Sequence, residues 1–308
     1  MGSNPQILYT PQQQMGYGGY SVPCRVGNWA EDEYLGVLLT AGHLTKQGEG
    51  TLTSQQLSGT IGAARAPAML APAPADGIVR YGDTVMLSAA LGGVLALDTI
   101  VRMELPQEAY SVTRTQPAAA VACTRTAWTV TPPAGHAVPE DGVLRIGTSF
   151  CLEAVGGAGN NLYLQSQRYT LHNQNYSASA GKRKQGCCVV PSGSADTLWQ
   201  VRVLDPSDLR QMEAEGAPVP ANTFISLVHV NTQIALHTGP SKISNKYGGE
   251  FEISAFTDES PVKGAFGKRN GKMLEVGNHW AFTTAEAEEA PAVKPPATEA
   301  AEAPAAEA

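Results

Sequence analysis

The sequence predicts a mostly all-β protein whose body is built from three similar units. Three observations lead to this prediction: the composition, an opening pattern that recurs three times, and a tryptophan that closes each recurrence. The 308 residues include 32 Gly and 21 Pro, which suit turns between short strands. Only 16% of the residues are charged, which is low for a protein with many helical surfaces. The length fits one long domain or two short ones.

Each of the three units opens with a turn residue placed five positions before a leucine. The turn residues are Gly82, Gly147 and Asn222, and the leucines are Leu87, Leu152 and Leu227. A turn and a second apolar run follow each opening, at 94–97, 162–164 and 234–236. The turns of the first two units are rich in glycine, which favours hairpins.

Each unit closes on a tryptophan inside a polar-x-Trp-x-apolar pattern, and these residues are Trp128, Trp199 and Trp280. A strand pair with one apolar face cannot hide that face alone, but three pairs around a pseudo-threefold axis bury it together. A tryptophan that buries roughly 200 Å² would plug the shared core. The pattern therefore predicts a β-trefoil-like body with the three tryptophans in its core. A two-sheet sandwich is the alternative, but it gives no reason for a threefold tryptophan.

Composition along the chain divides it into five segments. Residues around 29–46 begin with acids and continue with apolar side chains, which predicts a short helix. The polar start and the Ala/Pro/Glu-rich end lack periodicity, so both are expected to be extended or disordered. The predicted segments are an extended arm at 1–23, an N-terminal segment with the short helix at 24–61, an Ala/Pro linker at 62–76, the β-trefoil-like body at 77–284 and a disordered acidic tail at 285–308.

Charge and cysteine usage exclude several classes of protein. The net charge is −7, and the tail supplies −5 of it. The body is therefore near neutral, whereas a nucleic-acid binder needs a basic stripe. No apolar run approaches 18 residues and no leader-like segment opens the chain, so we expect no membrane contact and a cytoplasmic location. The five Cys form no CxxC, which favours reduced thiols over a disulfide framework or a zinc site.

The sequence contains no constellation that indicates catalysis. It has no Gly-x-Ser-x-Gly, and the Gly-rich stretch 156–159 lacks the Lys-Ser/Thr of a phosphate loop. His229 and His237 flank the third hairpin turn, but spacing marks no third ligand for a metal. We therefore expect no enzyme activity and no catalytic, cofactor-binding or metal-binding residues.

Two groups of residues are candidates for binding a partner. The first lies around Trp29 outside the threefold pattern, where Trp and Arg are favoured at interfaces; its members are Arg25, Asn28, Trp29, Glu31 and Asp32. Two structural roles are the alternatives: Trp29 packs this segment on the core, and the acids Glu31 and Asp32 stabilise the start of a helix. The second is the basic cluster Lys182, Arg183 and Lys184, placed in a predicted polar loop from 173 to 186. It is either a solvated loop or a contact for an acidic surface.

Seven short stretches, spread from about residue 24 to residue 282, together resemble the family of cilia- and flagella-associated protein 161. No single stretch is a signature, but their order and spacing are specific. They lie at 25–32, 81–87, 150–152, 162–164, 218–222, 247–250 and 278–280. The body also resembles the MIR repeats of β-trefoil domains. Ricin-type sugar-binding trefoils favour Gln two residues before the tryptophan. This chain has Thr126, Thr197 and Asn278 there, which argues against a lectin.

The resemblance implies a structural microtubule inner protein of the ciliary or flagellar axoneme. Such a protein would lie in the lumen of the doublet A-tubule, bind the luminal face of α/β-tubulin and other inner proteins, and catalyse nothing. This places the chain in the cytoskeleton of the cilium. The alternative function is a soluble β-trefoil module that binds sugar or phosphoinositide, and it predicts a shallow pocket with aromatic and polar residues.

Overall fold

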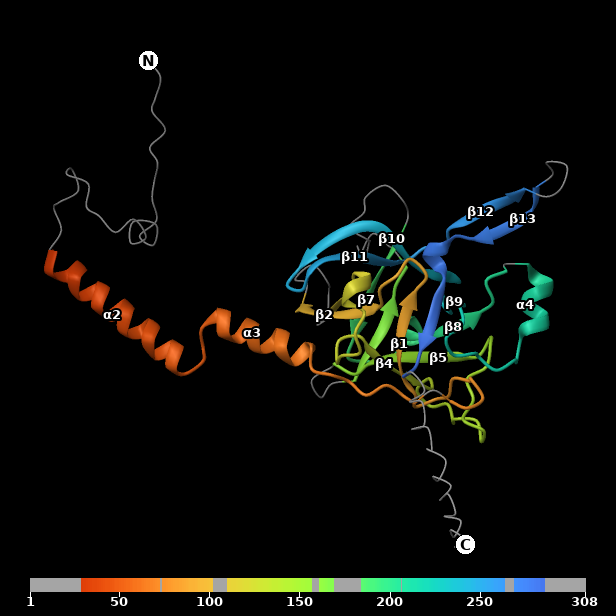
Figure 1. Cartoon of the computed structure of the whole chain (residues 1–308), viewed down its shortest axis with the longest axis horizontal. Helices are drawn as coiled ribbons and strands as arrows, with labels where there is room; N and C mark the ends of the chain where they lie inside the picture. The colour runs from red at the N-terminus through yellow and green to blue at the C-terminus, as the bar shows by residue number, and fades with distance from the viewer. Residues whose placement is uncertain are drawn as a thin grey trace, which may run out of the picture. The chain divides into compact units, whose positions relative to one another are not determined.

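The computed structural model describes most of the chain between residues 29 and 285. The residues divide into two compact units, Met1–Gly59 and Thr60–Ala308. The predicted N-terminal arm and almost all of the predicted acidic tail lie outside the described residues. Those described are 29–72, 74–101, 110–156, 161–168, 184–205, 207–263 and 269–285 (Figure 1).

The predicted N-terminal helix is confirmed as α2, Trp29–Gly48. It ends where Gly50 takes a positive φ of 71°, a conformation that glycine adopts without steric cost. A second helix that was not predicted, α3, spans Thr53–Ala64. The predicted linker at 62–76 therefore begins inside α3, and Pro67 then pairs with Cys123 of the β body.

Six strands form a closed ring in which each is hydrogen-bonded to the next. Antiparallel pairs join β1 to β4, β4 to β5, β5 to β8 and β8 to β9, and β14 returns to β1. The last gap closes through a bridge between Ile225, just before β9, and Trp280. The strands are β1 (Thr84–Ala89), β4 (Ala127–Thr131), β5 (Ser149–Ala154), β8 (Trp199–Arg202), β9 (Ser226–His229) and β14 (Trp280–Thr283).

Three hairpins cap this ring, one from each unit. Their second strands pair with one another in a triangle, β3 with β7, β7 with β11 and β11 with β3. A six-stranded ring capped by three hairpins is the β-trefoil arrangement that the sequence predicts. The hairpins are β2 (Leu95–Val101) with β3 (Tyr110–Arg114), β6 (Leu162–Ser166) with β7 (Gln185–Val190), and β10 (Ile234–Asn245) with β11 (Gly248–Ala255).

The position of strand β7 corrects the predicted end of the polar loop. The polar loop was expected to run to Gly186, but Gln185 and Gly186 belong to β7 and are buried. The adjacent Cys187 and Cys188 continue this strand, whose six residues are all buried. The run of thiols and valines that follows the loop therefore builds the core of the second unit.

A cycle of three backbone hydrogen bonds marks the pseudo-threefold axis. The Val79 N–H donates to the Val219 carbonyl at 3.0 Å, Val219 donates to Leu144 at 2.9 Å, and Leu144 donates back to Val79 at 3.0 Å. All three residues are fully buried. Each bond joins two different units, so the complete cycle forms only when all three units are in place.

The three closing tryptophans occupy equivalent places in the core, as predicted. Trp128, Trp199 and Trp280 are fully buried. Each indole Nε1–H donates to the carbonyl of the leucine at or near the start of its own hairpin, with distances of 3.1, 2.9 and 3.0 Å to Leu95, Leu164 and Leu236. A buried indole N–H needs such a partner, so burial and the hydrogen bond together fix each ring.

The opening turn residues also behave alike. Gly82, Gly147 and Asn222 all take positive φ, at 91°, 83° and 56°. Asparagine is one of the few side chains that tolerate this region, which explains how it replaces glycine in the third unit. Each of the three N–H groups donates to the carbonyl two residues after a closing tryptophan, that of Val130, Val201 or Phe282.

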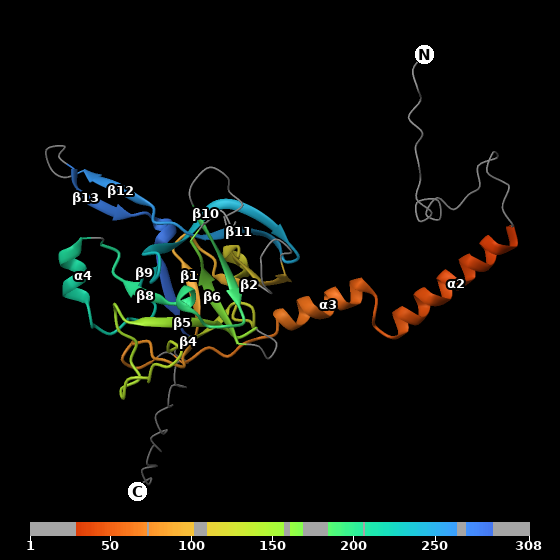
Figure 2. The same cartoon turned by 180° about the vertical axis from the view of Figure 1, so that it is seen from behind.

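Several short elements complete the body. Single turns of 3₁₀ helix precede the closing strands, at Pro117–Ala119, Ala195–Thr197 and Val276–Asn278. The helix α4, Asp208–Ala214, joins the second unit to the third. A two-stranded ribbon of β12 (Glu259–Lys263) and β13 (Arg269–Leu274) leads into the last closing strand, and both views show it extending away from the ring (Figures 1 and 2).

Replacing Trp199 by Ala should lower the free energy of unfolding by about 3–5 kcal/mol, because it removes a fully buried indole and leaves a cavity. The measurement is equilibrium denaturation in urea. Phe224 is an aromatic residue that is 49% exposed, so Phe224→Ala serves as the control and should cost under about 1 kcal/mol. A loss below about 1 kcal/mol for Trp199→Ala would show that this tryptophan does not plug the core.

Candidate interaction surfaces

Helix α2 carries a row of apolar residues at the spacing of one helix face. Tyr34, Val37, Leu38, Ala41 and Leu44 follow an i, i+3, i+4, i+7, i+10 pattern, which is typical of a face that packs against another element. We call this row the α2 apolar stripe. All five residues are exposed, with Tyr34 at 66% and Leu44 at 59%. Side chains of this size are normally buried, so the stripe is a candidate contact surface.

The first group of predicted partner-binding residues lies at the start of this helix. Trp29 is the first residue of α2, and Glu31 and Asp32 belong to its first turn. Acids at this place favour a helix N-terminus because they oppose the positive end of its dipole. Arg25 and Asn28 lie outside the described residues. Whether any of the five contacts a partner stays a prediction.

The basic cluster is described only at its end. Lys184 is half-buried and immediately precedes β7, while Lys182 and Arg183 lie outside the described residues. The Lys184 ammonium lies 5.4 Å from the centre of the Phe256 ring, within the range of a cation–π contact. This lysine therefore packs on the β body and is not a freely solvated member of a loop.

A buried ion pair that the sequence analysis did not find joins the first and third units. Arg125 donates to both carboxylate oxygens of Glu250, at 2.8 and 2.9 Å. The hydroxyl of Thr113 and the amide of Asn245 also donate to Glu250, each at 2.6 Å. Burial raises the pKa of Glu250, but these hydrogen bonds outweigh it and hold the pKa below its ordinary value. The Arg125 guanidinium stacks 3.7 Å from the Tyr247 ring centre, so the stretch 247–250 is structural.

The histidines that flank the third hairpin turn are tied to separate partners. His229 is fully buried; its Nδ1 lies 2.8 Å from the Thr232 hydroxyl and its Nε2 lies 2.9 Å from the Asp196 carbonyl. Since that carbonyl can only accept, Nε2 carries the proton and Nδ1 accepts from Thr232. His237 faces Asp258 instead, at 3.9 Å. Among the described residues, no three His, Cys, Asp or Glu side chains are grouped to hold a metal ion.

The described cysteines are engaged in the core. Cys123, Cys151, Cys187 and Cys188 are free thiols and all are buried. Burial raises the pKa of Cys151 and of Cys187, and it raises that of Cys188 to about 12. Because the thiolate is the reactive form, burial keeps Cys151, Cys187 and Cys188 poorly reactive near neutral pH.

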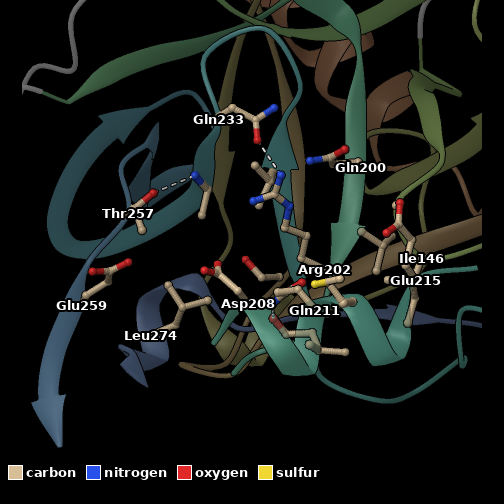
Figure 3. A pocket seen from close by; sticks show the side chains of 17 residues that line it. Ile146, Gln200, Arg202, Asp208, Gln211, Glu215, Gln233, Thr257, Glu259 and Leu274 are labelled. Atoms are coloured by element: carbon tan, nitrogen blue, oxygen red, sulfur yellow. Dashed lines mark hydrogen bonds between the residues drawn. The ribbon is translucent and has the colours of Figure 1, made fainter. Parts of the chain in front are cut away.

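A cavity of about 620 Å³ lies beside α4, on the outer side of β8 and β9 (Figure 3). Among the described residues its lining has polar side chains but no aromatic ring, so it shows only one of the two features expected of a sugar site. Of the lining residues that the structure describes, Arg202 alone is a lysine or arginine, and Asp208, Glu215 and Glu259 are carboxylates. A phosphoinositide headgroup carries several negative charges, which one arginine beside three carboxylates cannot neutralise.

These observations define the class of the protein as a β-trefoil with an exposed apolar helix N-terminal to its body. Within the described part of the chain, no helix is both long and apolar enough to cross a bilayer. The twelve trefoil strands, the threefold hydrogen bonds and the tryptophans set the fold, and the α2 apolar stripe is an exposed apolar surface on the helix.

Comparison with known proteins agrees with the resemblance found in the sequence. Residues 69–266 match the cilia- and flagella-associated protein 161-like domain, so the chain belongs to this family of cilia- and flagella-associated proteins. Cilia- and flagella-associated protein 161 of Bos taurus is 28% identical, over 86% of this chain and 82% of the relative. The protein of that name from Mus musculus is also 28% identical, over 84% and 88%.

A solved structure gives a weaker match. The SDF2-like protein from Arabidopsis thaliana is 16% identical, with a TM-score of 0.48, over 67% of this chain and 94% of that protein. The fold assignment therefore depends on the strand register and the threefold hydrogen bonds, and not on this likeness.

Acidification should destabilise the body through His229. Burial lowers the pKa of His229 below its ordinary value, so below about pH 6.5 the unfolded chain binds a proton that the folded chain does not. The free energy of unfolding should therefore fall between pH 7 and pH 5.5. His229→Gln should reduce this fall, measured as the urea midpoint at each pH, while His136→Gln, at an exposed position, should leave it unchanged. An equal fall in wild type and His229→Gln would contradict the assignment.

Proposed function

We propose that this chain is a structural microtubule inner protein in the lumen of the doublet A-tubule of cilia or flagella. It binds the luminal face of α/β-tubulin and neighbouring inner proteins, stabilises the axoneme for motility and catalyses no reaction. Membership of the cilia- and flagella-associated protein 161-like family supports a location in cilia or flagella. The α2 apolar stripe is the observation that carries the proposed docking.

The stripe supports docking because its exposure is costly to a chain that stays alone. Burying a single Leu, Val or Tyr side chain is worth about 1.5–3 kcal/mol. Tyr34, Val37, Leu38 and Leu44 lie on one face of α2 and are each at least half exposed. A helix of this kind typically lays its apolar face in a groove of another protein. The partner in this proposal is the tubulin lattice or an inner protein bound to it.

The chemistry of the body supports a structural role over catalysis. Its four described thiols are buried, His229 is held by Thr232 and Asp196, and the strong cation Arg125 is neutralised by Glu250. These groups are used to hold the fold. A protein enclosed in a polymer also needs no single tight site, because several weak contacts act together once its neighbours hold it in place.

Charged substitutions on the stripe should release the chain from axonemes. In ciliated cells that lack the endogenous protein, Val37→Glu/Leu44→Glu should reduce the amount retained in axonemes at least tenfold. The reason is that two apolar residues of the stripe become charged and can no longer be buried against a partner. Thr40→Glu/Gln47→Glu adds the same charge away from the stripe and should be retained like wild type. Retention is measured by immunoblotting of isolated axonemes, and urea denaturation checks that both variants fold.

Salt extraction tests the luminal location separately. Axonemes stripped of proteins on their outer surface should keep the wild-type chain, since the tubule wall encloses it. Release together with the outer-surface proteins would disprove the luminal placement. Equal retention of the two double variants would disprove docking through the stripe.

A further inference from the structure

The cavity beside α4 has a fixed wall on each side. Its floor is the outward face of β8 and β9, where Arg202 lies opposite Ser226 and Gln200 lies opposite Val228. The other wall is α4, whose Gln211 amide donates to the carbonyls of Val203 and Asp205, at 2.9 and 2.6 Å. Hydrogen bonds therefore tie α4 to the chain that follows β8, on one side of the cavity.

Arg202 lines this cavity, where hydrogen bonds hold its guanidinium in place but no described carboxylate pairs with it. Its guanidinium donates to the side-chain oxygen of Gln233 (Figure 3). With its amide turned so that the oxygen faces the guanidinium, Gln200 accepts from Nε at 2.9 Å and from Nη2 at 2.6 Å. Both partners are neutral amides, and among the described residues no carboxylate lies within ion-pair distance of Arg202. The charge is held in place but not paired.

Ser226 supplies a second polar group that lacks a partner. It is fully buried, it lines the cavity, and its hydroxyl forms no hydrogen bond with any described residue. A buried hydroxyl without a partner costs about 1–3 kcal/mol. A partner that enters the cavity reaches this fully buried hydroxyl once the lining side chains move apart to admit it.

The threefold symmetry shows that the fold itself does not require this pair. In the register of the strands, Arg202 opposite Ser226 corresponds to Thr131 opposite Cys151 in the first closing strand and to Thr283 opposite Met86 in the third. Two of the three equivalent places thus manage with threonine opposite a sulfur-containing residue. The cation and the unpaired hydroxyl occur only in this unit, beside the cavity.

We infer that this cavity binds one carboxylate, carried beside an apolar side chain on a segment of a neighbouring protein. The carboxylate pairs with Arg202 and accepts from Ser226, and the apolar group contacts the buried Val228, Ala235 and Leu274. The three carboxylates of the lining disfavour a ligand with several negative charges. The choice of a protein segment over a free small molecule rests on the proposed function, whereas the carboxylate site itself does not.

A peptide titration of the full-length chain tests the inference. The probes are the capped peptide acetyl-Ala-Leu-Glu-Leu-Ala-amide and the same peptide with Gln in place of Glu. Binding is followed by the NMR signals of labelled methyl groups. Met212 lines the cavity and Met69 does not, so a saturable shift of the Met212 methyl with a constant Met69 signal is the expected result. The Gln peptide should bind at least tenfold more weakly.

Two variants separate the site from a general charge effect. Arg202→Thr introduces the residue found at both equivalent places, so it should fold and bind the Glu peptide at least tenfold more weakly. Arg80→Thr removes one cation from a position outside the lining and should bind like wild type. Equal binding of the Glu and Gln peptides, or equal binding by wild type and Arg202→Thr, would overturn the inference.

Three further titrations complete the test. Inositol hexaphosphate should bind more weakly than the Glu peptide, and tighter binding would instead assign the cavity to polyanions. Butyrate alone should bind at least tenfold more weakly than the peptide, and equal binding would replace the protein segment with a small carboxylate. Val37→Glu/Leu44→Glu should bind the peptide normally, so failure of docking through α2 and failure of this site remain distinguishable.

Discussion

The structure depends on the closed cycle of hydrogen bonds among Val79, Leu144 and Val219. Each of these residues belongs to a different unit, and each both donates and accepts within the cycle. The cycle brings the three openings together, and the three buried tryptophans then belong to one shared core. Since backbone groups buried in such a place must be paired, the three units fold as one body, and the exposed surfaces of the protein are built on that fixed frame.

The threefold fold could be predicted from the sequence because the residues that indicate it lie close together within each unit. Gly82, Gly147 and Trp199 are recognisable by residue type and spacing, and the structure gives each the conformation or burial expected. The third strand of each unit was missed for a physical reason. Strand β7 follows a long polar stretch, and its adjacent Cys187 and Cys188 suggest a metal or disulfide site more readily than a buried strand.

The interaction surfaces were harder to predict because they depend on what the fold leaves uncovered. The apolar run in α2 suggested a helix, but only its exposure identifies a contact surface. The ion pair of Arg125 with Glu250 joins residues far apart in the sequence, and no spacing rule connects them. Arg202 is ordinary in the sequence, and its distinctiveness appears only when the strand register places it opposite Ser226.

The buried thiols have a practical consequence for studying this protein in its assembly. Cys123, Cys151, Cys187 and Cys188 lie on strands and turns of all but the third unit, and none is accessible in the closed body. A thiol-modifying reagent reaches them only when the surrounding strands separate, so their rate of labelling measures how often the body opens. The labelling rates of these four residues can therefore report whether enclosure by neighbouring proteins slows that opening.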